Sequence, residues 1–89
     1  MIEFQFSKYA QKQLMSFDKE LRLRIGNKLK MLKNHPDIFS ILVLMQDSDH
    51  STHRLRIGNY RLLIKLQIQQ KDYLHFIVLK IGHRKDIYQ

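Results

Sequence analysis

Three arginines cluster around a two-residue turn signal in the second half of the chain. Arg54 and Arg56 alternate with apolar residues before Gly58-Asn59, and Arg61 follows the turn after one tyrosine. A guanidinium group is planar and donates to two oxygens of one phosphate or carboxylate, a geometry that an ammonium group lacks. The spacing therefore predicts an anion-binding site. The alternative is a solvated basic surface, which is what most charged runs form.

The elements that must position these arginines are strands. Residues 52–57 and 60–68 alternate apolar and polar side chains, and a Gly-Asn pair between such segments is typical of a tight β-hairpin. A two-residue turn places Arg56 directly opposite Arg61. Like charges in opposed positions destabilise a sheet by a few tenths of a kcal/mol to about 1 kcal/mol, so the pairing favours a role in anion binding.

A third strand extends this cluster. Residues 73–81 are apolar on both faces, as expected of a central strand that is covered on both sides. We expect Gln69–Asp72 to form a four-residue loop, which places Arg61 opposite Lys80 on the new strand. Arg84 follows just beyond. The two hairpins together predict a row of cations across three neighbouring strands.

The first half of the chain predicts a strand and two helices. Residues 2–6 alternate apolar and polar side chains, and Ser7 and Asp18 are suitable N-caps for two successive helices. The second helix carries an apolar stripe and ends at the proline-containing segment Asn34–Asp37. Residues 39–45 fit either a short buried strand or an apolar loop. We predict one α+β domain over residues 1–89, with two N-terminal helices packed on a mainly antiparallel four-stranded sheet.

Charge and composition restrict the partners. The 89 residues carry a net charge of +8, and residues 52–89 contain eight basic and two acidic side chains. This excess favours a polyanionic partner such as nucleic acid or an acidic protein segment. The absence of cysteine excludes disulfides and thiolate chemistry. With no long apolar run, we expect a soluble cytoplasmic protein that does not bind a membrane.

The other candidate residues are weaker when each is taken alone. Tyr88 near the chain end could simply pack on the core, and His83 could be an ordinary surface histidine. His50 and His53 are separated by three positions, but no convincing third ligand accompanies them, so no metal site is predicted.

Two motifs together carry a family resemblance. The segments RLRIGNYR (residues 54–61) and GHRKDIY (residues 82–88) resemble the RelE/ParE superfamily of bacterial type II toxin–antitoxin toxins. The order of elements, the length and the basic charge agree with that superfamily over nearly the whole chain. The resemblance implies the same fold that the sequence pattern predicts.

The resemblance to the RelE branch implies cleavage of mRNA in the ribosomal A site, without a metal or another cofactor. The 2′-hydroxyl attacks the adjacent phosphate and leaves a 2′,3′-cyclic phosphate. Carried over by position, Arg61 stabilises the phosphorane, Arg84 acts as general acid or stabilises the leaving group, and Tyr88 is the general base. The expected RNA-binding residues are Arg54, Arg56, Lys80 and His83.

The same resemblance implies specific partners. We expect a cognate antitoxin, the ribosome and mRNA, with the free toxin monomeric and the complex with antitoxin hetero-oligomeric. Two alternatives remain open at this stage. One is a ParE-like inhibitor of DNA gyrase, and the other is a non-catalytic module that binds RNA or an acidic peptide.

Overall fold

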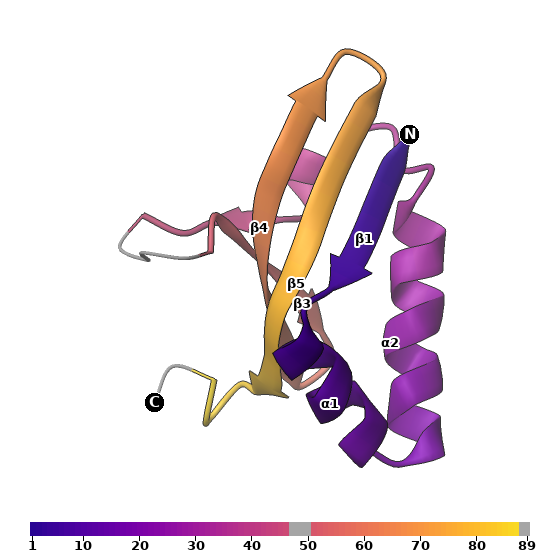
Figure 1. Cartoon of the computed structure of the whole chain (residues 1–89), viewed down its shortest axis with the longest axis vertical. Coiled ribbons are helices and arrows are strands. Elements are labelled where there is room, and N and C mark those ends of the chain that lie inside the picture. The colour runs from indigo at the N-terminus through magenta and orange to yellow at the C-terminus, as the bar shows by residue number, and fades with distance from the viewer. Residues whose placement is uncertain (47–50, 88–89) are drawn as a thin grey trace.

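A computed structural model describes residues 1–46 and 51–87 of the chain (Figure 1). The elements, in chain order, are β1 (Ile2–Phe6), α1 (Lys8–Ser16), α2 (Lys19–Leu32), the 3₁₀ helix η1 (Ile38–Ser40), β2 (Val43–Leu44), β3 (His53–Ile57), β4 (Tyr60–Gln70) and β5 (Tyr73–His83). This is the α+β class that the sequence predicts.

The two long helices begin at the predicted caps. The Ser7 hydroxyl accepts a hydrogen bond from the backbone N–H of Ala10, and the Asp18 carboxylate accepts one from the N–H of Leu21 at 2.8 Å. Each side chain satisfies a donor that the first helical turn leaves without a partner. Figure 1 shows α2 running alongside β1.

Within the described residues, the sheet has five strands rather than the predicted four. The strand order is β1-β5-β4-β3-β2, with β1 parallel to β5 and the other neighbouring pairs antiparallel. The extra strand is the two-residue β2 at the edge, which lies in the segment whose sequence is ambiguous between strand and loop. The sheet is therefore mainly antiparallel, as predicted.

The β3–β4 hairpin has the predicted register, with Arg56 opposite Arg61. The prediction for the β4–β5 hairpin is wrong, because Arg61 lies opposite Gly82 and Lys80 lies opposite Leu63. The turn there contains two residues instead of four, since Gln70 pairs with Tyr73.

The altered turn length accounts for the whole error in register. The strands shift by one residue between Leu66 and Ile68 and shift back between Leu63 and Ile64. Each shift is a one-residue irregularity of the bulge type. The extra residue lies in β4 at the first shift and in β5 at the second. The two cancel, so the register near Arg61 is the one that a two-residue turn dictates.

The hydrophobic core lies between the helices and one face of the sheet. Leu55, Leu62 and Ile81 come from three neighbouring strands and are no more than 1% exposed, and Ile25 of α2 packs in the same cluster. Side chains alternate between the two faces of a strand. The opposite face therefore carries Arg54, Arg56, Arg61, Leu63, Lys80 and Gly82, and we call it the arginine face.

Candidate phosphate-binding site

Four cationic residues occupy two adjacent cross-strand rows of the arginine face. One row, which we call the arginine row, is Arg56–Arg61–Gly82, and the next is Arg54–Leu63–Lys80. Directly opposed residues have Cβ atoms about 5 Å apart, so Arg56 and Arg61 repel each other across the hairpin. Among residues 1–46 and 51–87, no carboxylate lies within 4 Å of either guanidinium. The row favours an anionic ligand that would neutralise it.

Hydrogen bonds to the turn orient the Arg61 side chain. Its Nη1 donates to the carbonyl oxygens of Gly58 and Tyr60, both at 3.0 Å. Those bonds use the hydrogens of one nitrogen and leave Nε and Nη2 as donors for a phosphate, since a guanidinium carries five N–H groups. The residue is half-buried, so the guanidinium is positioned before a ligand arrives.

Gly58 itself is required by the turn. Its φ of +57° lies in the left-handed region, where a residue with a Cβ is strained. This conformation makes the tight hairpin that brings Arg56 and Arg61 into opposed positions.

The chain after β5 returns to this turn and brings Arg84 with it. The backbone N–H of Arg84 donates to the carbonyl of Asn59 at 2.8 Å. The N–H groups of Asp86 and Ile87 both donate to the carbonyl of His83, at 2.8 and 3.0 Å, and close a turn. Arg84 is exposed beside the β3–β4 hairpin, so the structure brings it to the same end of the sheet as Arg61.

Two of the predicted RNA-binding residues have other contacts. The Lys80 ammonium donates to the carbonyl of Ile87 at 3.2 Å. His83 pairs with Tyr60, so the strand alternation places it on the opposite face from Arg61, and its ring contacts the Tyr60 ring edge-on at 5.5 Å. Its Nδ1 accepts a hydrogen bond from the N–H of Lys85 at 3.2 Å. Their proposed contacts with RNA stay predictions.

Tyr88, the predicted general base, lies outside the described residues, as do Asp47 and His50. His53 is described, and it is a core residue rather than a surface ligand. Its ring packs against Phe39 and Phe76, with centroids 5.5 and 6.2 Å away. Within residues 1–46 and 51–87, no group of three or more histidine and acidic side chains is arranged to hold a metal.

Sequence reasoning missed one cation near the turn. The Arg24 Nη1 lies 3.6 Å from the position that a Cβ on Gly58 would occupy, so this arginine of α2 reaches the β3–β4 hairpin. Its pairing with Glu20 is long, at 3.9 Å, and both side chains are largely exposed. Such a pair contributes little. No sequence signal identifies Arg24, because the helix packing alone decides which side of α2 meets the turn.

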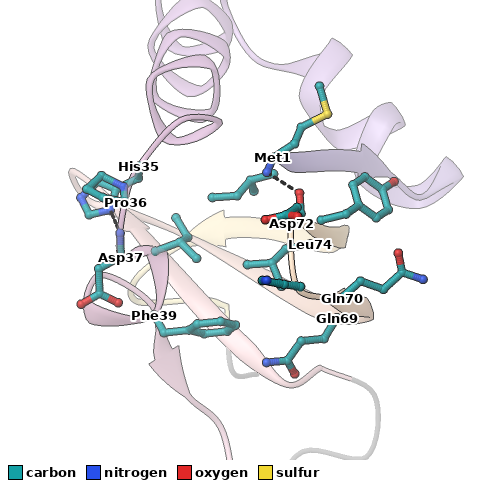
Figure 2. A pocket seen from close by; sticks show the side chains of 13 residues that line it. Met1, His35, Pro36, Asp37, Phe39, Gln69, Gln70, Asp72 and Leu74 are labelled. Atoms are coloured by element: carbon teal, nitrogen blue, oxygen red, sulfur yellow. Dashed lines mark hydrogen bonds between the residues drawn. The ribbon is translucent and has the colours of Figure 1, made fainter.

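A cavity of about 650 Å³ lies at the other end of the β4–β5 hairpin (Figure 2). It opens between the Pro36 segment and the strand ends at Gln69 and Leu74. The amino terminus of Met1 donates to the carbonyl of Asp72 at its edge, at 2.7 Å. This cavity contains none of the residues of the arginine face.

In the described part of the chain, no helix has the length and apolar character needed to cross a membrane.

The comparisons with known proteins identify the fold. No family model matches the sequence, and no curated protein matches it. The chain is similar in structure to RelE proteins of solved toxin–antitoxin complexes, which confirms the resemblance that the two motifs indicate.

Three of these structures span nearly the whole chain. For the RelBE2 toxin–antitoxin complex of Mycobacterium tuberculosis, the TM-score is 0.71 at 17% identity, over 91% of this chain and 95% of the other. For the archaeal RelE–RelB complex of Pyrococcus horikoshii, it is 0.70 at 19% identity, over 96% and 97%. For the RelB–RelE antitoxin–toxin complex of Methanococcus jannaschii, it is 0.65 at 26% identity, over 94% of both chains.

Proposed function

We propose that this chain, which has the fold of RelE toxins, is the toxin of a type II toxin–antitoxin pair and cleaves mRNA on the ribosome. The observation that carries the proposal is the opposed pair Arg56 and Arg61, which has no neutralising carboxylate nearby among the described residues. A phosphodiester supplies the negative charge that this pair lacks. Arg84, held beside the same hairpin, adds a third guanidinium.

The proposed reaction needs only side chains and the RNA itself. The 2′-hydroxyl loses its proton to Tyr88 and its oxygen attacks the adjacent phosphorus, while the bond from phosphorus to the 5′-oxygen breaks. The departing 5′-oxygen takes up a proton from water, and the products are a 2′,3′-cyclic phosphate and a 5′-hydroxyl. Arg61 faces the phosphorane, and Arg84 stabilises the departing oxygen.

The arginines also act on Tyr88, the proposed general base. A free tyrosine has a pKa of about 10 and is a poor base at neutral pH. Positive charges favour the phenolate and lower that pKa, so the arginine row would activate Tyr88 as well as bind the phosphate. Preorganised donors aimed at developing charge are commonly the largest single contribution to catalysis.

The proposed partners follow from the same charge pattern. The similar structures are complexes of RelE with RelB antitoxins. We propose a cognate antitoxin whose acidic side chains cover the arginine face, which would exclude RNA. Action on the ribosome places the protein in the cytoplasm.

A growth assay tests the proposal in cells. Expressed without antitoxin, the wild-type chain should arrest growth, and the double variant Arg61→Ala, Tyr88→Phe should relieve the arrest. The variant Lys71→Ala is the matched control, because Lys71 is an exposed cation in the distant β4–β5 turn. Full toxicity of the double variant, or a DNA damage response with translation initially spared, would contradict the proposal and favour a gyrase inhibitor.

A further inference from the structure

We infer that Lys80 and Gly82 form a seat that holds the segment 84–87 on the arginine face, and that Lys80 is a positioning residue instead of an RNA contact. The seat stands on contacts within the chain. Only its effect on catalysis rests on the proposed function.

The burial of Ile87 is the first observation. This residue is 2% exposed, although it lies close to the end of the chain, and it does not belong to the main core cluster between helices and sheet. Its side chain packs over Gly82 of β5 instead. Gly82 lies on the arginine face opposite Arg61, so Ile87 covers the sheet beside the arginine row.

Glycine at position 82 lets Ile87 pack closely on β5. A Cβ on Gly82 would lie 2.8 Å from Ile87 Cδ1 and 3.5 Å from the Cα and Cβ of the same residue. Real Cβ atoms essentially never approach another heavy atom that closely. In contrast to Gly58, Gly82 has no positive φ, so the backbone conformation itself would accept a side chain. A side chain at this position would therefore act through Ile87, whose Cδ1 would have to move.

Hydrogen bonds fix both ends of the segment. The Lys80 ammonium donates to the Ile87 carbonyl, and the Arg84 N–H donates to the Asn59 carbonyl. Lys80 lies on the arginine face two residues before Gly82, so the cation and the glycine act on the same residue from neighbouring positions of β5. The last residues of most domains are poorly ordered unless contacts of this kind hold them.

The seat has a consequence for the reaction. Tyr88 follows Ile87 directly in the sequence, and a general base acts only within hydrogen-bond reach of the proton that it takes. A device that anchors Ile87 should therefore control the chemical step and leave RNA binding to Arg54 and Arg56.

The first arm of the test does not depend on activity. Amide hydrogen exchange is measured on the full chain for wild type, Lys80→Met, Lys80→Arg and Gly82→Ala. Met keeps the aliphatic stem and removes the donor. We expect the amides of Asp86 and Ile87 to exchange about tenfold faster or more in Lys80→Met and faster by a smaller factor in Gly82→Ala, with the core strands unchanged and Lys80→Arg close to wild type. Unchanged exchange at these amides in both disruptive variants would overturn the seat.

The second arm separates binding from chemistry on ribosomes programmed with mRNA. Lys80→Met should slow single-turnover cleavage about tenfold or more while ribosome affinity stays within about twofold, and Lys80→Arg should restore the rate. Weaker binding by Lys80→Met with unchanged exchange would identify Lys80 as an RNA contact and refute the inference. Faster exchange with an unchanged cleavage rate would refute its catalytic part. If the wild type cleaves nothing, the proposed function fails, and the exchange arm still decides the seat.

Discussion

Arg56 and Arg61 lie directly opposite each other in the β3–β4 hairpin, on the sheet face that the helices leave uncovered. Arg61 is tied to the turn through two carbonyl groups, so it does not simply swing away from its neighbour. The hairpin therefore keeps two guanidinium groups close together at a cost in stability. A ligand phosphate offsets that cost, and several measurable consequences arise from this relationship.

Removing one member of the pair should stabilise the free protein. We expect Arg56→Thr to raise the free energy of unfolding by a few tenths of a kcal/mol to about 1 kcal/mol at low salt, because opposed like charges repel and threonine suits a strand. The gain should shrink as salt screens the repulsion. Urea denaturation at two salt concentrations measures both effects.

Lys65→Thr is the matched control for that change. Lys65 is exposed on β4 and lies opposite Ile77 rather than another cation, so its replacement should show a smaller salt-dependent gain than Arg56→Thr. An equal gain in both variants would show that strand propensity, and not the pairing of Arg56 with Arg61, is responsible.

Single-stranded RNA binding should depend on salt through the same residues. Each arginine that contacts a phosphate contributes roughly −0.7 to the slope of log K against log salt concentration. Arg54→Ala and Arg56→Ala should each make the slope shallower by about that amount, whereas Lys71→Ala should leave it unchanged. Fluorescence anisotropy with a short RNA measures the slopes. If Arg54→Ala and Arg56→Ala have the same slope as the control Lys71→Ala, RNA binds elsewhere on the protein.

Acid should destabilise the protein through His53. Burial lowers the pKa of this histidine below its usual 6.5. The Thr52 hydroxyl accepts a hydrogen bond from the Leu66 N–H at 2.8 Å and shares a second one with Nδ1 of His53, also at 2.8 Å.

The direction of the pH effect follows from linkage. As pH falls through about 6.5, the unfolded chain takes up a proton on His53 while the folded chain does not, so the free energy of unfolding decreases. The decrease levels off below the folded pKa. Denaturation of wild type and His53→Gln between pH 7.5 and 5 should show a smaller loss in the variant. Equal losses would show that His53 does not contribute.

His75 offers an opposite test, in which a substitution should increase stability. Its Nδ1 is buried and has no hydrogen-bond partner among the described residues. Its ring stacks on Tyr73, with a centroid distance of 6.4 Å. We expect His75→Phe to keep the ring contact, remove the unsatisfied nitrogen and raise the free energy of unfolding by about 1 kcal/mol. Thermal unfolding at pH 7.5 measures this, and a lower melting temperature would contradict it.

The site could be predicted from sequence wherever short-range rules decide the geometry. The Gly58-Asn59 turn and the alternation around it place Arg56 opposite Arg61, because a two-residue hairpin permits only one register. The position of Lys80 could not be obtained in this way. Its partner depends on the length of the β4–β5 turn, and Lys71-Asp72 gives a weaker turn signal than Gly-Asn.

The features that could not be predicted from the sequence depend mostly on long-range packing. Nothing in the local pattern indicates that Ile87 covers Gly82 or that Lys80 binds the Ile87 carbonyl, because these contacts form only when the chain folds back after β5. The strand β2 could not be predicted from the sequence either, because two residues give too short a pattern to distinguish a strand from a loop.

The most direct test of the account is a cell-free translation reaction in which the ends of the mRNA are mapped. We expect the wild-type protein to produce cuts at the ribosomal A site that carry 2′,3′-cyclic phosphate and 5′-hydroxyl ends. Arg61→Ala should reduce cleavage at least about a hundredfold, as expected when a preorganised charge donor is removed, and Lys71→Ala should cleave normally. Intact mRNA with the wild-type protein, or undiminished cleavage by Arg61→Ala, would contradict the claim that the arginine row is a catalytic phosphate site.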